Sequence, residues 1–168
     1  MFTRKAVSLA LVLIMALMLV GSAGPVAGQG GEHWCAGQHI RFFVGGAEGD
    51  AFASIVLRGA QQAEMDLGPT VDYVFSGWDP ERMIQQLREA IAAQPDGIAM
   101  MGHPGDDAIM PLAEEAAAAG IVMMYQNVDV PRVRARFGSG YVGANLDPQG
   151  YALGAEAIRL YGFGEGDK

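Results

Sequence analysis

The stretch that decides the fold is residues 40–52, IRFFVGGAEGDAF. Its beginning, apolar and aromatic around one arginine, predicts a buried strand. Gly45, Gly46 and Gly49 then interrupt the strand pattern, and a helical pattern follows them. A strand that runs into a glycine-rich turn and then a helix is the first half of a β-α-β unit. In open α/β sheets the crevice for a ligand lies just beyond the carboxyl ends of such strands, so we expect this loop to form one wall of a binding site.

The same alternation continues along the chain. Apolar residues from Phe52 to Leu67 recur at helical spacing. Further strands are predicted at residues 71–75, 98–101, 121–125 and 141–142, with helical patterns between the longer ones. Connections of this length are right-handed and place the strands in parallel. The sequence therefore predicts fold class α/β, a doubly wound parallel sheet whose nearly continuous apolar strands suit a sheet covered on both faces.

Aspartates are expected to begin three of the helices. Asp79 is a good N-cap, with Pro80 at the first helical position. Asp107 can cap the next helix, and Asp147, which also precedes a proline, opens the last one. Between these two helices lies a segment flanked by proline and glycine, which indicates a solvated loop or edge for its basic residues, Arg132, Arg134 and Arg136.

The N-terminus has the three parts of a secretory signal peptide. Arg4 and Lys5 precede an almost continuously apolar segment, residues 6–20, and small residues follow it. An apolar segment of ~15 residues is short for a membrane-spanning helix, which needs about 20; an uncleaved anchor is the alternative. We expect residues 1–28 to be removed, residues 29–38 to form a flexible tail, and the mature protein to be periplasmic or extracellular.

The charge and the cysteine content limit the kinds of partner that the protein can have. The sequence has 19 acidic and 11 basic residues, a formal net charge of −8. A nucleic-acid surface needs clustered Lys and Arg, so no nucleic-acid partner is expected. Cys35 is the only cysteine. In an exported protein such a cysteine is either inert or paired with a cysteine outside this chain.

Polar and aromatic side chains gather at the predicted carboxyl ends of four strands. Carboxylates and amides can pair with hydroxyl groups, while aromatic rings pack against C–H faces, and a sugar needs this mixture. The candidate ligand-binding residues are Glu48, Asp50 and Phe52 after the first strand, Trp78 after the second, His103 after the third, and Gln126 and Asn127 after the fourth.

Some of these residues also have a simpler interpretation. Phe52 begins an apolar helical face and can belong to the core. Asp79, beside Trp78, is expected mainly to cap its helix. His103, before Pro104, can be an ordinary loop residue. Trp78 in a polar loop is less easily explained as core.

Catalytic and metal-binding motifs are not found in the sequence. The glycines of residues 45–49 do not fit the dinucleotide spacing G-x-G-x-x-G, and there is neither a phosphate-binding loop nor a G-x-S-x-G nucleophile elbow. No His and Cys residues have a zinc spacing. We therefore expect no enzymatic activity, no cofactor and no metal. An exported α/β enzyme is the alternative.

The motifs, in their order and spacing, resemble the periplasmic sugar-binding proteins of ABC transporters, in the ribose- and galactose-binding branch (periplasmic binding protein type I fold). The resemblance covers residues 38–168. The segments that carry it are residues 50–52 (DAF), 58–61 (RGAQ), 94–98 (QPDGI), 103–108 (HPGDDA), 119–122 (AGIV) and 141–143 (YVG).

The resemblance implies a two-lobed clamp that binds a simple sugar or polyol between its lobes, closes by a hinge, and delivers the sugar to an ABC permease. Asp50 and Phe52 match the polar and stacking residues of the first loop. Asn127 matches the polar residue after the fourth strand, and Asn145 lies just past the first hinge crossing. The ribose-type Asp-Arg pair is replaced here by Gln126 and Asn127, so the resemblance does not name the sugar.

Members of this family have roughly twice this mature length, about one more domain, so the resemblance implies an N-terminal fragment. Residues 39–142 would form the N-terminal ligand-binding lobe. Residues 143–168 would form the hinge crossing and the first helix of a second lobe that is largely missing. The full-length protein is expected to be a monomer. A sugar-sensing binding protein for a membrane receptor is the alternative within the same fold.

Overall fold

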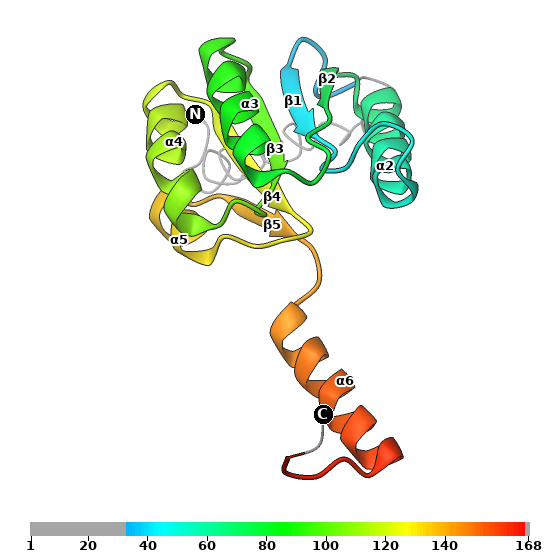
Figure 1. Cartoon of the computed structure of the whole chain (residues 1–168). Helices are drawn as coiled ribbons and strands as arrows, with labels where there is room; N and C mark the ends of the chain where they lie inside the picture. The colour runs from blue at the N-terminus through cyan, green and yellow to red at the C-terminus, as the bar shows by residue number, and fades with distance from the viewer. Residues whose placement is uncertain (1–32, 167–168) are drawn as a thin grey trace, which may run out of the picture. The chain divides into compact units, whose positions relative to one another are not determined.

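The computed structural model of the protein describes residues 33–166 (Figure 1). The predicted signal peptide lies outside the described residues. Within them, no helix is both long and apolar enough to cross a membrane. Strands and helices alternate in the order β1 (His39–Phe43), α2 (Ala51–Leu67), β2 (Thr70–Val74), α3 (Pro80–Ala92), β3 (Gly97–Met101), α4 (Asp106–Ala118), β4 (Val122–Gln126), α5 (Pro131–Phe137), β5 (Gly140–Val142) and α6 (Leu146–Tyr161).

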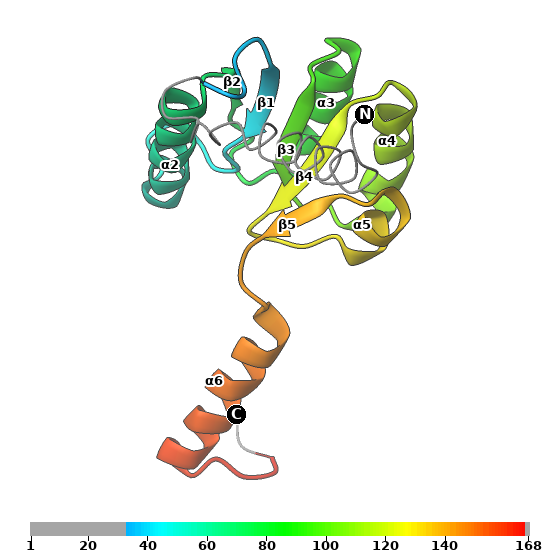
Figure 2. The same ribbon diagram turned by 180° about the vertical axis from the view of Figure 1, so that it is seen from behind.

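The strands form one parallel sheet in the order β2-β1-β3-β4-β5. β1 pairs with β2 up to Phe43 opposite Val74. The pairing of β1 with β3 is shorter and ends at Phe42 and Ala99. This strand order makes β1 and β3 the neighbours at which the winding of the sheet reverses. The predicted doubly wound parallel sheet is confirmed (Figures 1 and 2).

The core lies between one face of the sheet and helices α3, α4 and α5. Side chains alternate between the two faces along each strand, and Phe43, Met100 and Tyr125 are buried on this face. Burying each large apolar side chain stabilises the fold by about 1.5–3 kcal/mol, so this face fixes the three helices to the sheet. The helix residues in this core include Leu87, Ala90, Ile109, Ala116 and Val133.

The opposite face of the sheet carries α2, which covers it incompletely. Phe42, Ala99 and Met124 lie on this face, and with α2 they line an apolar cavity of about 390 Å³. The apolar stripe predicted on α2 lines the same cavity, where Ile55 is 61% exposed, and Ala53 is the one buried residue of the helix. We expected helices to cover both faces of the sheet. Among residues 33–166, helices cover one face fully and the α2 face only in part.

Two helices begin at other residues than the pattern predicted. α4 begins at Asp106 after Gly105, which has a φ of 82°. Asp107 therefore lies inside the first turn and does not cap the helix. α6 begins at Leu146, one residue before the predicted Asp147. By contrast, the predicted cap of α3 is confirmed, because the side chain of Asp79 accepts hydrogen bonds from the first turn.

The prediction of a loop or edge for the segment with three arginines was wrong, because residues 131–137 form the helix α5. A proline at the first helical position favours a helix start, and Gly138 ends the helix with a φ of 72°. The arginines lie close to acidic partners on neighbouring elements, Arg132 with Asp107, Arg134 with Asp129, and Arg136 with Glu114.

The residues before β1 are joined to α2 and β2. The N–H of Cys35 donates to the carbonyl of Leu67, and the N–H of Thr70 donates to the carbonyl of Gln38, each over 2.9 Å. Cys35 is a free thiol of intermediate exposure. Part of the segment predicted as a flexible tail thus has defined backbone contacts.

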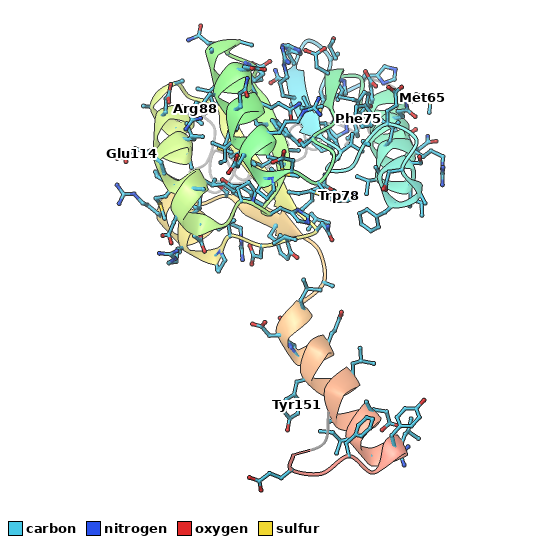
Figure 3. The ribbon with its side chains drawn as sticks, in the orientation of Figure 1. Met65, Phe75, Trp78, Arg88, Glu114 and Tyr151 are labelled. Carbon is cyan, nitrogen blue, oxygen red and sulfur yellow. The ribbon has the colours of Figure 1, made fainter. Side chains whose placement is uncertain are left out.

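Helix α6 buries none of its residues. Tyr151, Leu153 and Ile158 are all exposed on it, and Figure 3 shows Tyr151 on this helix. Amphipathic helices of this length owe most of their stability to packing of an apolar face against other elements. The apolar side chains of α6 therefore indicate a surface that needs a partner.

Candidate functional site

The loops β1–α2, β2–α3 and β3–α4 all leave the same edge of the sheet, because parallel strands share one carboxyl end. Figure 3 shows Trp78 at this edge and Met65 at the far end of α2. Helices α2 and α4, which follow β1 and β3, lie on opposite faces of the sheet. Open α/β sheets bind their ligands at such a switch between neighbouring strands.

Asp50 precedes α2 and is held there by two hydrogen bonds. Its Oδ1 accepts from the backbone N–H of Ala53 over 2.9 Å, which caps the helix. Its Oδ2 accepts from the indole N–H of Trp78 over 3.2 Å. These hydrogen bonds hold the pKa of Asp50 below its ordinary value, so the carboxylate is ionised at neutral pH. Each carboxylate oxygen has two lone pairs, so each oxygen can also accept a hydrogen bond from a hydroxyl group of a ligand.

Three rings from three different strand–helix units form a row beside Asp50. The ring centroid of Trp78 lies 5.7 Å from that of Phe52 and 5.5 Å from that of His103, with interplanar angles of 57° and 54°. Tilted contacts at such distances are favourable for aromatic pairs. Phe52 is 46% exposed, so the row offers an open apolar surface beside an ionised carboxylate. We call Asp50, Phe52, Trp78 and His103 the edge cluster.

The edge cluster depends on a close approach of Trp78 to the β1–α2 loop. The backbone N–H of Trp78 donates to the carbonyl of Gly45 over 2.9 Å, and the N–H of Gly77 donates to the carbonyl of Gly46 over 3.1 Å. A Cβ atom at Gly46 would lie 3.0 Å from the indole ring and 2.9 Å from the Cβ of Ala53. Glycine at this position therefore lets the indole lie directly on the loop backbone.

His103 ends the row on the β3–α4 loop. Its Nδ1 is buried and has no hydrogen-bond partner among the described residues. Burial lowers the pKa of His103, so the ring is neutral at neutral pH. A buried unpaired nitrogen costs about 1–3 kcal/mol and calls for an explanation. A neutral imidazole has one donor and one acceptor, so this ring can exchange a hydrogen bond with a hydroxyl group.

Gln126 and Asn127 lie at the end of β4, and both side chains contact the protein. The amide of Gln126 donates to the carbonyl of Phe43 over 3.0 Å. The amide of Asn127 approaches the sulfur of Met101 at 3.7 Å, a weak contact that leaves its hydrogen-bonding capacity largely unused. Asn127 has a φ of 61°, a left-handed conformation that asparagine adopts more readily than most residues. Of the two, Asn127 is better placed to bind a ligand.

Besides Gln126 and Asn127, two further predicted site residues, Glu48 and Asn145, take no part in the edge cluster. Glu48 is exposed in the β1–α2 loop. Asn145 is exposed before α6, and its side chain makes no capping hydrogen bond to the helix. Their roles stay predictions. Asp79 accepts hydrogen bonds from the N–H groups of Glu81 and Arg82 over 2.9 and 3.2 Å, which agrees with its simpler interpretation as a cap.

The edge cluster offers stacking and hydrogen bonding. In the part of the chain that the structure describes, no three His, Cys, Asp or Glu side chains are grouped so as to hold a metal ion. Asp50 and His103 contact different parts of the Trp78 side chain, the indole N–H and the ring. The arrangement suits recognition of a neutral ligand with hydroxyl groups.

One residue that sequence reasoning passed over lies near Asn127. The hydroxyl of Tyr141 in β5 lies within donating distance of two carbonyls, those of Asn127 at 2.8 Å and Ala144 at 3.1 Å. The guanidinium of Arg134 lies 5.5 Å from the Tyr141 ring centroid, within the range of a cation–π contact. Tyr141 thereby joins the loop after β4 to the segment after β5. Its signals in the sequence are a tyrosine in a very short strand and the segment 141–143 (YVG), which carries part of the family resemblance.

Comparison with known proteins identifies the family to which this fold belongs. The family model described as the periplasmic binding protein domain matches residues 41–165. None of the curated proteins compared with the chain matches it. Among solved structures, a carbohydrate transporter from Acidothermus cellulolyticus 11B, in complex with myo-inositol, is 27% identical with a TM-score of 0.64, over 73% of this chain and 42% of that one.

Two further structures show the same fold. A glucose-galactose binding protein from Geobacillus stearothermophilus is 21% identical with a TM-score of 0.64, over 74% of this chain and 43% of that one. A periplasmic sugar binding protein from Legionella pneumophila is 20% identical with a TM-score of 0.64, over 73% of this chain and 45% of that one. The chain thus spans less than half the length of these three proteins. Because the family model covers most of its length, the chain belongs to the periplasmic binding protein family, as its motifs predicted.

Proposed function

We propose that this chain forms the first lobe of an exported solute-binding protein that captures a simple sugar or polyol and delivers it to an ABC permease. The observation that carries the proposal is the edge cluster, in which the ionised carboxylate of Asp50 lies beside the rings of Phe52, Trp78 and His103. The similarity to a carbohydrate transporter in complex with myo-inositol supports a ligand of this class.

The chemistry of a sugar or polyol fits these groups. The C–H face of the ligand can lie against the exposed ring of Phe52. A ligand hydroxyl can donate to Asp50, and a charge-assisted hydrogen bond of this kind is stronger than a neutral one. A second hydroxyl can pair with the imidazole of His103, which is partly exposed. The amide of Asn127 can bind a third hydroxyl at the next strand.

The proposal assigns one side of the binding cleft to this chain. Residues 39–142 would be the first lobe, and residues 143–168 would begin the second. Three observations support this division. The chain covers only 42% of the Acidothermus protein. Helix α6 follows the last strand of the sheet, and its apolar side chains are exposed. In the complete clamp, Glu48 and Asn145 would face the cleft. Residues 1–28 would direct export to the periplasm or beyond and would then be removed.

A ligand panel tests the proposal. The protein, purified from cells that express its complete gene, would be unfolded thermally with myo-inositol, D-galactose, D-glucose, D-ribose, D-arabinose and glycerol. A ligand present at 100 times its Kd stabilises the folded state by about 2.7 kcal/mol, so at least one compound should raise the Tm by several degrees. If every compound leaves the Tm unchanged at millimolar concentration, the sugar or polyol proposal is wrong.

A further inference from the structure

We propose that Trp78 is a positioning residue of this site, which fixes the plane of the Asp50 carboxylate and the place of the Phe52 ring before a ligand arrives. The inference rests on the proposed function for the nature of the ligand. Its geometric part rests on contacts within the first lobe alone. A tryptophan that only filled space would need none of the polar contacts described below.

Trp78 touches each of the other three members of the edge cluster. Its indole N–H reaches Oδ2 of Asp50 over 3.2 Å, while the helix cap at Ala53 holds Oδ1 of the same carboxylate. A carboxylate bound through both of its oxygens cannot rotate about its Cβ–Cγ bond without losing a hydrogen bond. Its remaining lone pairs therefore keep fixed directions. The ring of Trp78 also packs between those of Phe52 and His103.

The backbone at Trp78 supports a role beyond turning the chain. Its φ is 63°, in the left-handed region that few residues other than glycine adopt. Strained residues of this kind persist only where surrounding contacts determine them, and they cluster at functional sites. Glycine or asparagine would make the same turn with less strain. The contacts of the indole with Asp50 and with the backbone at Gly46 thus offset the strain of this conformation.

A set of tryptophan variants tests the positioning role. The chain has two tryptophans, and Trp34 is 75% exposed, so W34F is a matched control that removes an indole outside the edge cluster. In that background, W78F keeps an aromatic ring and removes the donor. We expect W34F to retain the parent affinity for myo-inositol and for the best ligand of the panel, and W78F to weaken it about tenfold, the effect of one hydrogen bond to a charged group.

D50N separates positioning from packing. Asparagine is also a good N-cap, so this variant keeps the start of α2 and replaces the carboxylate. If Trp78 acts through Asp50, the losses caused by W78F and D50N should not add, because both remove the same interaction. Fully additive losses would show that Trp78 acts independently of Asp50 and would overturn the inference.

A measurement without ligand makes the inference testable on its own. Carbon-13 NMR titration of the carboxyl groups in W34F should place the pKa of Asp50 below its ordinary value, because Ala53 and Trp78 both donate to it. Adding W78F should move that pKa upward, while Glu156 on α6, whose pKa is lowered by its hydrogen bond from Arg159 and not by Trp78, serves as a reference. An unchanged Asp50 pKa in folded W78F overturns the positioning role. A shifted pKa without binding of any panel compound supports positioning and contradicts the proposed ligand class instead.

Discussion

The side-chain amide of Gln126 donates a hydrogen bond to the backbone carbonyl of Phe43 over 3.0 Å. These residues end β4 and β1, which are separated in the sheet by β3. The ladder between β1 and β3 ends one residue earlier, at Phe42 and Ala99. The amide thus reaches a carbonyl just beyond the ladder and joins two loops at the edge where the candidate site lies.

This bridge predicts a specific loss of stability in Gln126→Met. Methionine keeps the length of the side chain and removes its donor, so the free energy of unfolding should fall by about 1–2 kcal/mol. Urea denaturation at an unchanged m-value would measure the loss. Gln85→Met is the control, because the exposed amide of Gln85 bonds only across its own helix to Glu89. Equal effects of the two substitutions would show that the bridge does not stabilise the fold.

Phe52→Ala should weaken ligand binding with little effect on the fold. The ring is 46% exposed and contacts the Trp78 ring, so its removal takes away stacking surface but little of the core. We expect Kd for the best panel ligand to rise about tenfold by calorimetry. Ile55→Ala, one turn further along α2 and 61% exposed, should keep the parent affinity. Unchanged binding by Phe52→Ala would place its ring in packing alone.

The Asp129–Arg134 pair predicts a contribution to acid unfolding. The guanidinium of Arg134 donates to both oxygens of Asp129, over 2.6 and 2.8 Å, and lowers the pKa of Asp129 from its ordinary 3.8. A carboxylate whose pKa is lower in the folded state stabilises the fold above its unfolded pKa and loses that contribution as the pH falls below it.

Between about pH 5 and pH 3, the parent protein should therefore lose more unfolding free energy than Asp129→Asn, which has no carboxylate to protonate. Urea denaturation at a series of pH values would show the difference. Parallel stability curves for the two proteins would mean that the pair does not contribute. Arg134 stays charged over this range, because an arginine side chain loses its proton only far above it.

Two neighbouring residues of β4 should differ in their response to substitution by threonine. Met123 is 6% exposed in the core, whereas Val122, on the other face of the sheet, is 64% exposed. We expect Met123→Thr to cost about 2–4 kcal/mol, as a polar and smaller side chain in the core. Val122→Thr should stay within about 0.5 kcal/mol of the parent.

Denaturation of both variants would also test the state of the α2 face of the sheet. If Val122→Thr proves as destabilising as Met123→Thr, then Val122 is covered in the folded protein, either by a part of the protein outside residues 33–166 or by a partner. Equal mild effects would instead contradict the assignment of Met123 to the core.

The sequence by itself determined the fold class, the family and the edge at which the candidate residues meet. Apolar runs and helical periodicity locate strands and helices from local pattern alone, and long right-handed connections then require parallel strands. Parallel strands share one carboxyl end, so Asp50, Trp78 and His103 could be placed at one edge before their contacts were known. The cap at Asp79 was equally local, since an aspartate before a proline satisfies the first turn of its own helix.

Only the tertiary structure decided which of these residues touch. The strand order β2-β1-β3-β4-β5 depends on long-range pairing, and it sets the loops after β1, β2 and β3 side by side. The hydrogen bond from Trp78 to Asp50 spans 28 residues of sequence, and the close approach of the indole to Gly46 needs a backbone conformation that no local pattern encodes. Helix α5 was missed for a different reason, because its local start and stop signals, a proline at the first helical position and Gly138 after the last, are equally typical of a loop. Long-range contacts thus decided the site, because they join side chains that local periodicity treats independently.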